Sequence, residues 1–196
     1  MGSRRLGRKR LYSLNKEGQS LAKTNGAGAP IVTHQNVRRE GDRIITTIGV
    51  DLGSSLATAL KKHNTLGEVI GDDGVANAYI AELTLADNGY IVYAEMICLE
   101  QPDNDARDID LYVNNNALAF EGDATSGGTQ LIACGGNLDV GSHVASAVTL
   151  KDFGAPDADK YLYLAAGAAG AGVVTLTTGK LLIILEGIAS DAVADL

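Results

Sequence analysis

Apolar and polar residues alternate along most of the chain from Ile31 onward, and a period of two is typical of half-buried β-strands. In residues 43–52, for example, aliphatic side chains fall on one face, while Thr47, Gly49 and Asp51 fall on the other. The pattern predicts strands at residues 43–52, 75–85, 90–99, 107–113, 129–134, 143–150, 160–166, 172–178 and 180–188. The strands predominate, and they do not alternate with helices, which argues against a doubly wound α/β fold.

Turn residues suggest how these strands connect. Asp87-Asn88-Gly89 predicts a hairpin between strands 75–85 and 90–99, and Thr178-Gly179 predicts another before residues 180–188. The glycine-rich run 167–172 stands between two strands, not between a strand and a helix, so we interpret it as a hairpin loop and not as a dinucleotide-binding loop.

One segment, residues 53–63, predicts a short helix. Ser54 or Ser55 could cap it, and two lysines occupy its last turn, where the helix dipole favours them. We therefore expect a mostly β fold: a jelly-roll-like antiparallel β-sandwich of about eight strands with at most one short helix. This body spans residues 30–196.

Residues 1–29 lack the strand pattern and predict a basic N-terminal arm that ends in a flexible glycine-containing joint at residues 24–30. Residues 1–43 contain ten Lys or Arg and three Asp or Glu, whereas the rest of the chain contains six and twenty-one. A basic arm on an acidic body predicts two different partner surfaces, and the acidic body would repel nucleic acid.

The composition narrows the functional classes. Hydrophobic residues make up 45% of the chain but aromatic residues only 5%, and Trp is absent, so the core must be aliphatic. Cys98 and Cys134 lie in apolar runs and are expected to be buried thiols. No run approaches the ~20 apolar residues that span a bilayer, and no apolar segment follows the first basic residues as in a secretory leader. We expect no membrane association.

Catalytic patterns are missing from the sequence. The three histidines, His34, His63 and His143, are far apart and are interpreted as structural or surface residues. No Gly-x-Ser-x-Gly motif is present, and no zinc-type spacing of His and Cys is present. We expect a protein that is not an enzyme and requires no cofactor.

A cation site is conceivable in one acidic stretch, because oxygen-rich loops suit Ca²⁺. Its carboxylates lack the glycine and the closing glutamate of a helix–loop–helix calcium site, so solvated loop carboxylates are the preferred interpretation. The weak candidates are Asp103, Asp105, Asp108 and Asp110.

The arm carries the sharpest sequence feature, a basic cluster with interleaved apolar residues. Pure phosphate binding does not require the apolar members, so the mixture favours docking onto a protein surface. The candidate partner-binding residues are Arg4, Arg5, Leu6, Arg8, Lys9, Arg10, Leu11, Tyr12 and Leu14.

The opening segment 1–16, together with residues 43–52 and the closing strand 180–188, resembles small virion proteins of marine tailed phages. The resemblance implies a capsid decoration or cement protein that binds the outer face of the shell through its arm. It implies the major capsid protein as partner, no catalytic residues, and a location on the virion after assembly in the host cytoplasm.

Two other functions remain open. A jelly roll with a basic arm is also the plan of a small-virus coat protein whose arm binds the genome, although five clustered charges are few for that task. A carbohydrate-binding β-sandwich is weakened by the scarcity of aromatic residues. Because Leu181–Leu185 is apolar on both faces, we expect a homo-oligomer, and specifically a trimer.

Overall fold

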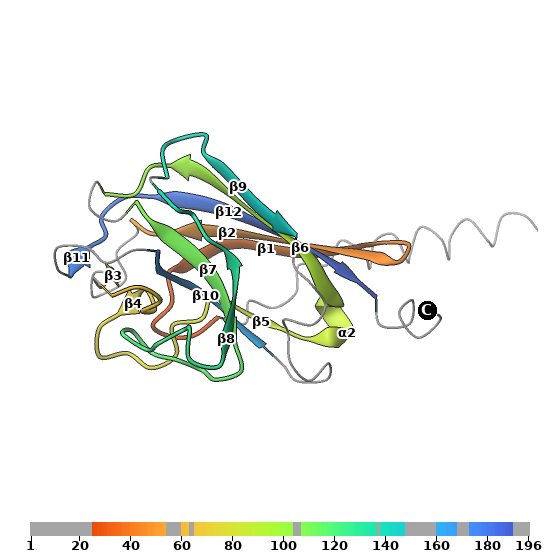
Figure 1. The fold of residues 1–196 in the computed structure, drawn as a ribbon, viewed down its shortest axis with the longest axis horizontal. Coiled ribbons are helices and arrows are strands. Elements are labelled where there is room, and N and C mark those ends of the chain that lie inside the picture. The colour runs from red at the N-terminus through yellow and green to blue at the C-terminus, as the bar shows by residue number, and fades with distance from the viewer. Residues whose placement is uncertain are drawn as a thin grey trace, which may run out of the picture.

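The computed structural model describes residues 25–53, 60–62, 65–103, 107–136, 138–147, 160–167 and 173–189 (Figure 1). These residues form twelve strands and one short helix. The elements are β1 (Ile31–Glu40), β2 (Arg43–Asp51), β3 (Leu60–Lys62), β4 (Gly71–Asp72), β5 (Ala81–Leu83), α2 (Leu85–Asn88), β6 (Tyr90–Glu100), β7 (Ile109–Asn114), β8 (Gly128–Ile132), β9 (His143–Ala147), β10 (Lys160–Ala166), β11 (Val174–Thr175) and β12 (Lys180–Ile188).

Two antiparallel sheets face each other across the core (Figure 1). The five-stranded sheet has the order β1-β2-β12-β6-β9, and the four-stranded sheet has the order β5-β10-β7-β8. A small third sheet, β11-β3-β4, lies at one end of the sandwich. The expected mostly β antiparallel class is confirmed, with twelve strands instead of about eight.

Eight of the strands are nested in pairs. The first, β2, pairs with the last, β12; β5 pairs with β10; β6 pairs with β9; and β7 pairs with β8. Every pair is antiparallel, as in one long hairpin that is folded over on itself. This arrangement is a jelly roll. The other four strands flank this eight-stranded unit.

Strand β12 shows how the sequence produces these layers. Leu181, Ile183 and Leu185 are at most 1% exposed and point between the sheets. Leu182 and Ile184 alternate with them and lie half-buried on the opposite face. Because β12 pairs with β2 on one side and β6 on the other along its whole length, its alternation positions the central part of the sheet.

The hairpin predicted between residues 75–85 and 90–99 is wrong. β5 pairs with β10, whereas β6 belongs to the other sheet. Between them, α2 carries the chain from one sheet to the other, and its last residue, Asn88, is 3% exposed. Asn88 Nδ2 donates to Thr46 Oγ1 at 2.9 Å, and Asn88 Oδ1 accepts from the Thr84 amide at 2.9 Å. These bonds hold the crossover against β2.

The hairpin predicted at Thr178-Gly179 is also wrong. β11 pairs with β3 in the small sheet, and β12 pairs with β2 and β6. Thr177 and Thr178 instead bind Asp103, so side-chain hydrogen bonds redirect the chain here. The turn is real, but its two flanking strands join different sheets.

The predicted helix 53–63 is corrected where the structure describes it. Residues 60–62 form β3, with Leu60 and Lys62 buried and Lys61 half-buried. β3 pairs with β4 and with β11, so tertiary pairing overrides the local helical preference. Residues 54–59 and 63 lie outside the described part of the chain.

The expected flexible joint is packed against the body from residue 25 onward. The Gly26 amide donates to the Tyr79 carbonyl at 2.8 Å, and the Gly28 carbonyl accepts from the Asp72 amide at 2.9 Å. A Cβ on Gly26 would lie 1.8 Å from the Asn77 carbonyl oxygen, so only glycine fits. Ala29 is 1% exposed. This part of the expected arm therefore completes the body.

Two neighbouring isoleucines test the layering. We expect Ile183→Ala to lower the free energy of unfolding by about 2–5 kcal/mol, because it opens a cavity at a fully buried position. Ile184→Ala removes the same atoms from the opposite face and should cost about 1 kcal/mol or less. Urea unfolding followed by circular dichroism measures both. Equal losses would contradict the assignment of the two faces.

Two truncations test where the body begins. Deletion of residues 1–29 should lower the free energy of unfolding by about 2 kcal/mol or more, because it leaves buried polar groups of residues 72 and 79 without partners and removes Ala29 from the core. Deletion of residues 1–24 removes none of these contacts and should leave stability close to that of the full chain. If the two truncations unfold alike, the packing of residues 25–29 contributes nothing.

Candidate functional site

The nine partner-binding candidates of the arm, Arg4 to Leu14, lie outside the described residues. Their role in docking stays a prediction. The described residues instead show three features that bear on function: an acidic clamp, a buried polar cluster and an aliphatic sheet face.

Asp103, the first calcium candidate, acts as a clamp between two loops. Its carboxylate accepts hydrogen bonds from the Thr177 amide at 2.5 Å, the Thr177 hydroxyl at 2.8 Å and the Thr178 amide at 3.2 Å. Burial alone would raise the pKa of Asp103, but these bonds outweigh it and hold the pKa below its ordinary value. Asp103 therefore joins the end of β6 to the segment that leads into β12.

Asp108 and Asp110, in contrast, lie together. Both side chains flank Gly167 after β10: a Cβ on Gly167 would lie 2.2 Å from Asp108 Oδ1 and 2.7 Å from Asp110 Oδ1. Asp110 is 2% exposed. It accepts from the Cys134 amide at 2.7 Å and from Gln130 Nε2 at 2.6 Å. Asp108 Oδ1 is buried and has no hydrogen-bond partner among the described residues.

Lys62 completes this group, which we call the buried polar cluster (Lys62, Asp108 and Asp110). Lys62 is 3% exposed, and Asp108 and Asp110 are the charged groups that act on it. Burial lowers the pKa of Lys62, although the two carboxylates oppose that shift. Burial raises the pKa of Asp110, and the nearby Asp108 adds to the effect. Both shifts favour uncharged side chains.

The sequence pattern does not predict this cluster. Lys62 falls in the last turn of the helix predicted at residues 53–63, where a solvated lysine is ordinary. The two aspartates are predicted only as weak calcium ligands. Their spacing of two on a strand was the usable signal, because it places both on one face.

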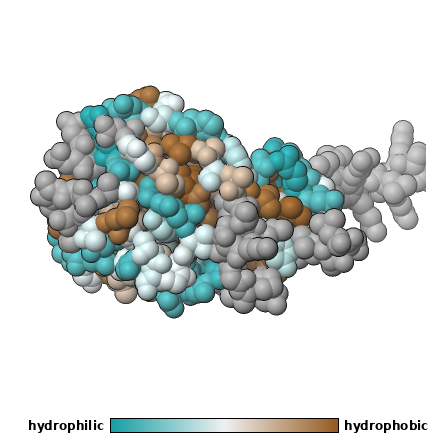
Figure 2. Space-filling view, in the orientation of Figure 1, coloured by the Kyte–Doolittle hydropathy of each residue, from teal (hydrophilic) through white to brown (hydrophobic). Residues whose placement is uncertain are grey.

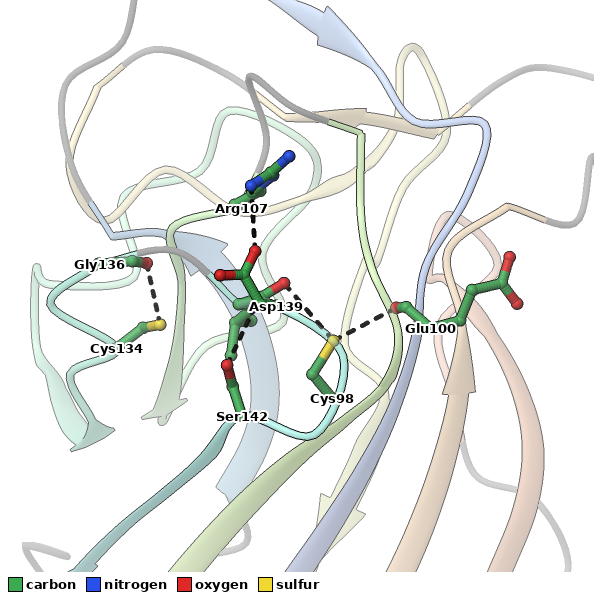
Figure 3. Close-up of polar contacts among 8 residues, drawn as sticks. Cys98, Glu100, Arg107, Cys134, Gly136, Asp139 and Ser142 are labelled. Carbon is green, nitrogen blue, oxygen red and sulfur yellow. Dashed lines mark hydrogen bonds and ion pairs between the residues drawn. The ribbon is translucent and has the colours of Figure 1, made fainter.

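Two thiols lie at the same end of the sandwich (Figure 3). Cys98 is 1% exposed, and its Sγ contacts the carbonyls of Glu100 at 3.4 Å and Leu138 at 3.5 Å. Cys134 is half-buried, and its Sγ lies 3.2 Å from the Gly136 carbonyl. Burial raises the pKa of both thiols, which disfavours the reactive thiolate. The expectation of a buried thiol is confirmed for Cys98 and holds in part for Cys134.

His143 begins β9, as expected, and it binds a partner on the sheet surface. Its Nε2 lies 2.9 Å from Glu95 Oε1 on the neighbouring strand β6. The adjacent Asp139 and Ser142 do not approach it as a catalytic set: Asp139 pairs with Arg107 at 3.0 Å, and Ser142 Oγ accepts from the Asp139 amide at 3.0 Å (Figure 3). His34 lies exposed on β1, and His63 is outside the described residues.

Metal and membrane sites can be judged only for the described residues. Within them, no three His, Cys, Asp or Glu side chains are grouped so that they could hold a metal ion. Asp105 lies outside them. The described helix is also too short to cross a membrane.

The outer side of the four-stranded sheet is covered by the chain itself. Tyr163 is fully buried there; its hydroxyl donates to the Asn116 carbonyl and accepts from the Leu118 amide, both at 2.7 Å. Tyr79 packs against Tyr161 in a tilted arrangement, with ring centroids 4.8 Å apart. These contacts seal a second, smaller apolar cluster under the loops.

The outer side of the five-stranded sheet is aliphatic and only half-buried. We call it the outer face, and its apolar members are Ile45, Tyr93, Ile97, Leu182, Ile184 and Ile188. The carboxylates among them are paired: Glu186 binds Arg43, and Glu95 binds His143. Aliphatic side chains whose neighbouring carboxylates already have partners suit contact with another protein surface.

Other apolar side chains reach solvent as well. The large exposed ones among the described residues are Leu66, Leu99, Val140 and Val173. Figure 2 shows apolar surface near the centre of the face viewed in Figure 1, between hydrophilic areas.

Comparison of the chain with protein-family models, with curated proteins and with solved structures found no match.

The Asp103 clamp generates a pH prediction. Because the folded-state pKa of Asp103 is lowered, its contribution to stability is present above the unfolded-state pKa of an aspartate and is lost as pH falls through the folded-state value. Asp103→Asn should therefore lower the melting temperature at neutral pH and bring it closer to that of the wild type in acid. Thermal unfolding across the acidic range measures this. Asp42 is exposed, so Asp42→Asn is the control and should leave the melting temperature unchanged both at neutral pH and in acid.

Proposed function

We propose that this chain is a capsid-associated structural protein of a virion, which attaches to the shell and stabilises it. The observation that carries the proposal is the nested pairing of eight strands in two sheets. Jelly rolls of this kind recur in viral capsid and lectin domains, because the two-sheet form leaves few exposed edges. A fold alone does not set a function, so the surface must support the choice.

Two further features favour an assembly protein. The outer face offers aliphatic side chains with paired charges, whereas the opposite sheet is sealed by its own loops. The chain also joins a basic N-terminal segment to an acidic body, so it can contact two surfaces of different charge. A sugar site normally uses exposed rings; Tyr163 is instead buried and hydrogen-bonded within the fold.

A coat subunit that forms the shell itself is the second candidate, and the completeness of the jelly roll favours it. Electron microscopy of the chain expressed alone separates the two. Closed shells would identify a coat protein, and discrete small oligomers would identify an accessory protein. A chain that is absent from virions, by immunogold labelling with antibodies against it, would overturn both.

Attachment can be assigned to a surface by two matched substitutions. We expect Ile184→Asp to weaken rebinding to virions stripped of the protein by more than about tenfold, because burial of one such side chain contributes roughly 1.5–3 kcal/mol. Val140→Asp changes an exposed apolar residue outside the outer face and should bind like the wild type. Sedimentation with particles measures occupancy. Equal binding by both variants would exclude the outer face and leave the N-terminal segment as the attachment site.

A further inference from the structure

We propose that strand β9 is the docking edge for a second copy of this chain, and that two β9 strands pair antiparallel about a two-fold axis at Ala145. The contact would join the five-stranded sheets of the two copies into one continuous sheet. This self-association does not depend on the virion role, so it can be tested on the isolated protein.

Strand β9 is an open edge of the sandwich. It ends the five-stranded sheet and pairs with β6 alone within the described part of the chain (Figure 1). His143, Ala145 and Ala147 are exposed, although β8 of the other sheet lies beside β9 at the same border. An edge of this kind is a template for another strand unless the chain protects it.

The other edges of the two main sheets carry such protection. β1 has a bulge between Val32 and His34 and ends in exposed charged residues at positions 38–40. β5 is only three residues long, and the register of β8 shifts against β7. β9 contains no bulge, no proline and no Lys, Arg, Asp or Glu. It is therefore the edge best suited to accept another strand.

The backbone of β9 directs its unpaired groups outward at alternate residues. The Cys98 amide of β6 donates to the Ser142 carbonyl at 2.9 Å, so the backbone groups of even-numbered residues face β6. The N–H and C=O groups of the odd-numbered residues consequently point away from the sheet. These residues are His143, Ala145 and Ala147. The Ala147 carbonyl also lies 3.4 Å from the neighbouring Ser146 hydroxyl, which leaves it a second lone pair.

The sequence of β9 is complementary to itself about Ala145. A two-fold axis there places Ala145 opposite Ala145 of the second copy and His143 opposite Ala147, so each outward N–H meets an outward C=O. Val144 then lies opposite Ser146, and all side chains keep the side of the sheet that they already occupy. No two like charges meet within the paired strands, although the chain as a whole is acidic. This symmetry favours a second copy over an unrelated segment.

The pairing also arranges the outer face. Because the axis is perpendicular to the sheet, the outer faces of both copies lie on the same side of the joined sheet. The pair thus presents its aliphatic surface twice in one direction, which strengthens binding to a repeated target. A two-fold contact closes on itself and gives a dimer, whereas the trimer expected from the sequence requires a different contact.

Sedimentation equilibrium of the full chain, at concentrations up to about 1 mM, tests the contact. The wild type should form dimers. Ala145→Lys sets two ammonium groups opposite each other across the axis and should weaken dimerisation at least about tenfold. Ala145→Glu should have the same effect. An equimolar mixture of the two variants should regain the dimer, because a lysine then faces a glutamate.

Thr33→Lys is the matched control, since Thr33 is exposed on β1 at the opposite edge of the same sheet. It should dimerise like the wild type. A wild type that stays monomeric at the highest concentration would overturn the proposal. A dimer that Ala145→Lys leaves intact, or a mixture of the two charged variants that stays monomeric, would overturn it as well.

Hydrogen exchange of the wild type provides a test without substitutions. The amides of His143, Ala145 and Ala147 should exchange more slowly as the protein concentration rises, because dimerisation gives them acceptors. Exposed amides of β1 should exchange at the same rate throughout. If the charged variants do not fold, this measurement decides alone, and β9 amides that exchange equally fast at all concentrations contradict the pairing.

Discussion

The pairing of β12 with both β2 and β6 holds the larger sheet of the sandwich together. It joins the last described strand to the first strand of the eight-stranded unit and to a strand from the middle of the chain. Such non-local contacts carry a large loop-closure entropy, so the apolar pattern of β12 must be strong enough to compensate. The alternation that buries Leu181, Ile183 and Leu185 supplies that stabilisation, and it also leaves an aliphatic second face.

The outer sides of the two sheets differ in how far the chain itself covers them. Loops and tyrosine side chains cover the outer side of the four-stranded sheet, and backbone groups of the covering loop bind the Tyr163 hydroxyl. Little of that side is therefore available to a partner. The five-stranded sheet keeps half-buried aliphatic side chains, and its neighbouring carboxylates contact Arg43 and His143. This asymmetry leaves the outer face as the surface to which the proposed attachment is assigned.

Several polar side chains at one end of the sandwich are shielded from water. Asp103 is satisfied by the loop before β12, whereas Asp108 Oδ1 is buried without a hydrogen-bond donor among the described residues. A buried carboxylate oxygen without a donor costs free energy, which the packing of the surrounding sheets must offset. The small sheet β11-β3-β4 lies at one end of the sandwich, and its strand β3 carries the buried Lys62.

The β class and most strand positions can be predicted from the amino-acid pattern, because period-two alternation is a local property that burial on one face imposes. The strands around Ile183 and Tyr163 could be located to within a residue or two on that ground. Tertiary structure alone decided the pairing: turn residues at Asp87-Asn88-Gly89 bend the chain equally well into a hairpin or across to another sheet, and the bond from Asn88 to distant Thr46 selects the second. It also decided that residues 60–62 form a strand, since β4 and β11 offer hydrogen bonds that a local pattern cannot include. The buried polar cluster was beyond the sequence for the same reason, because Lys62 on β3 and Asp110 on β7 belong to separate sheets.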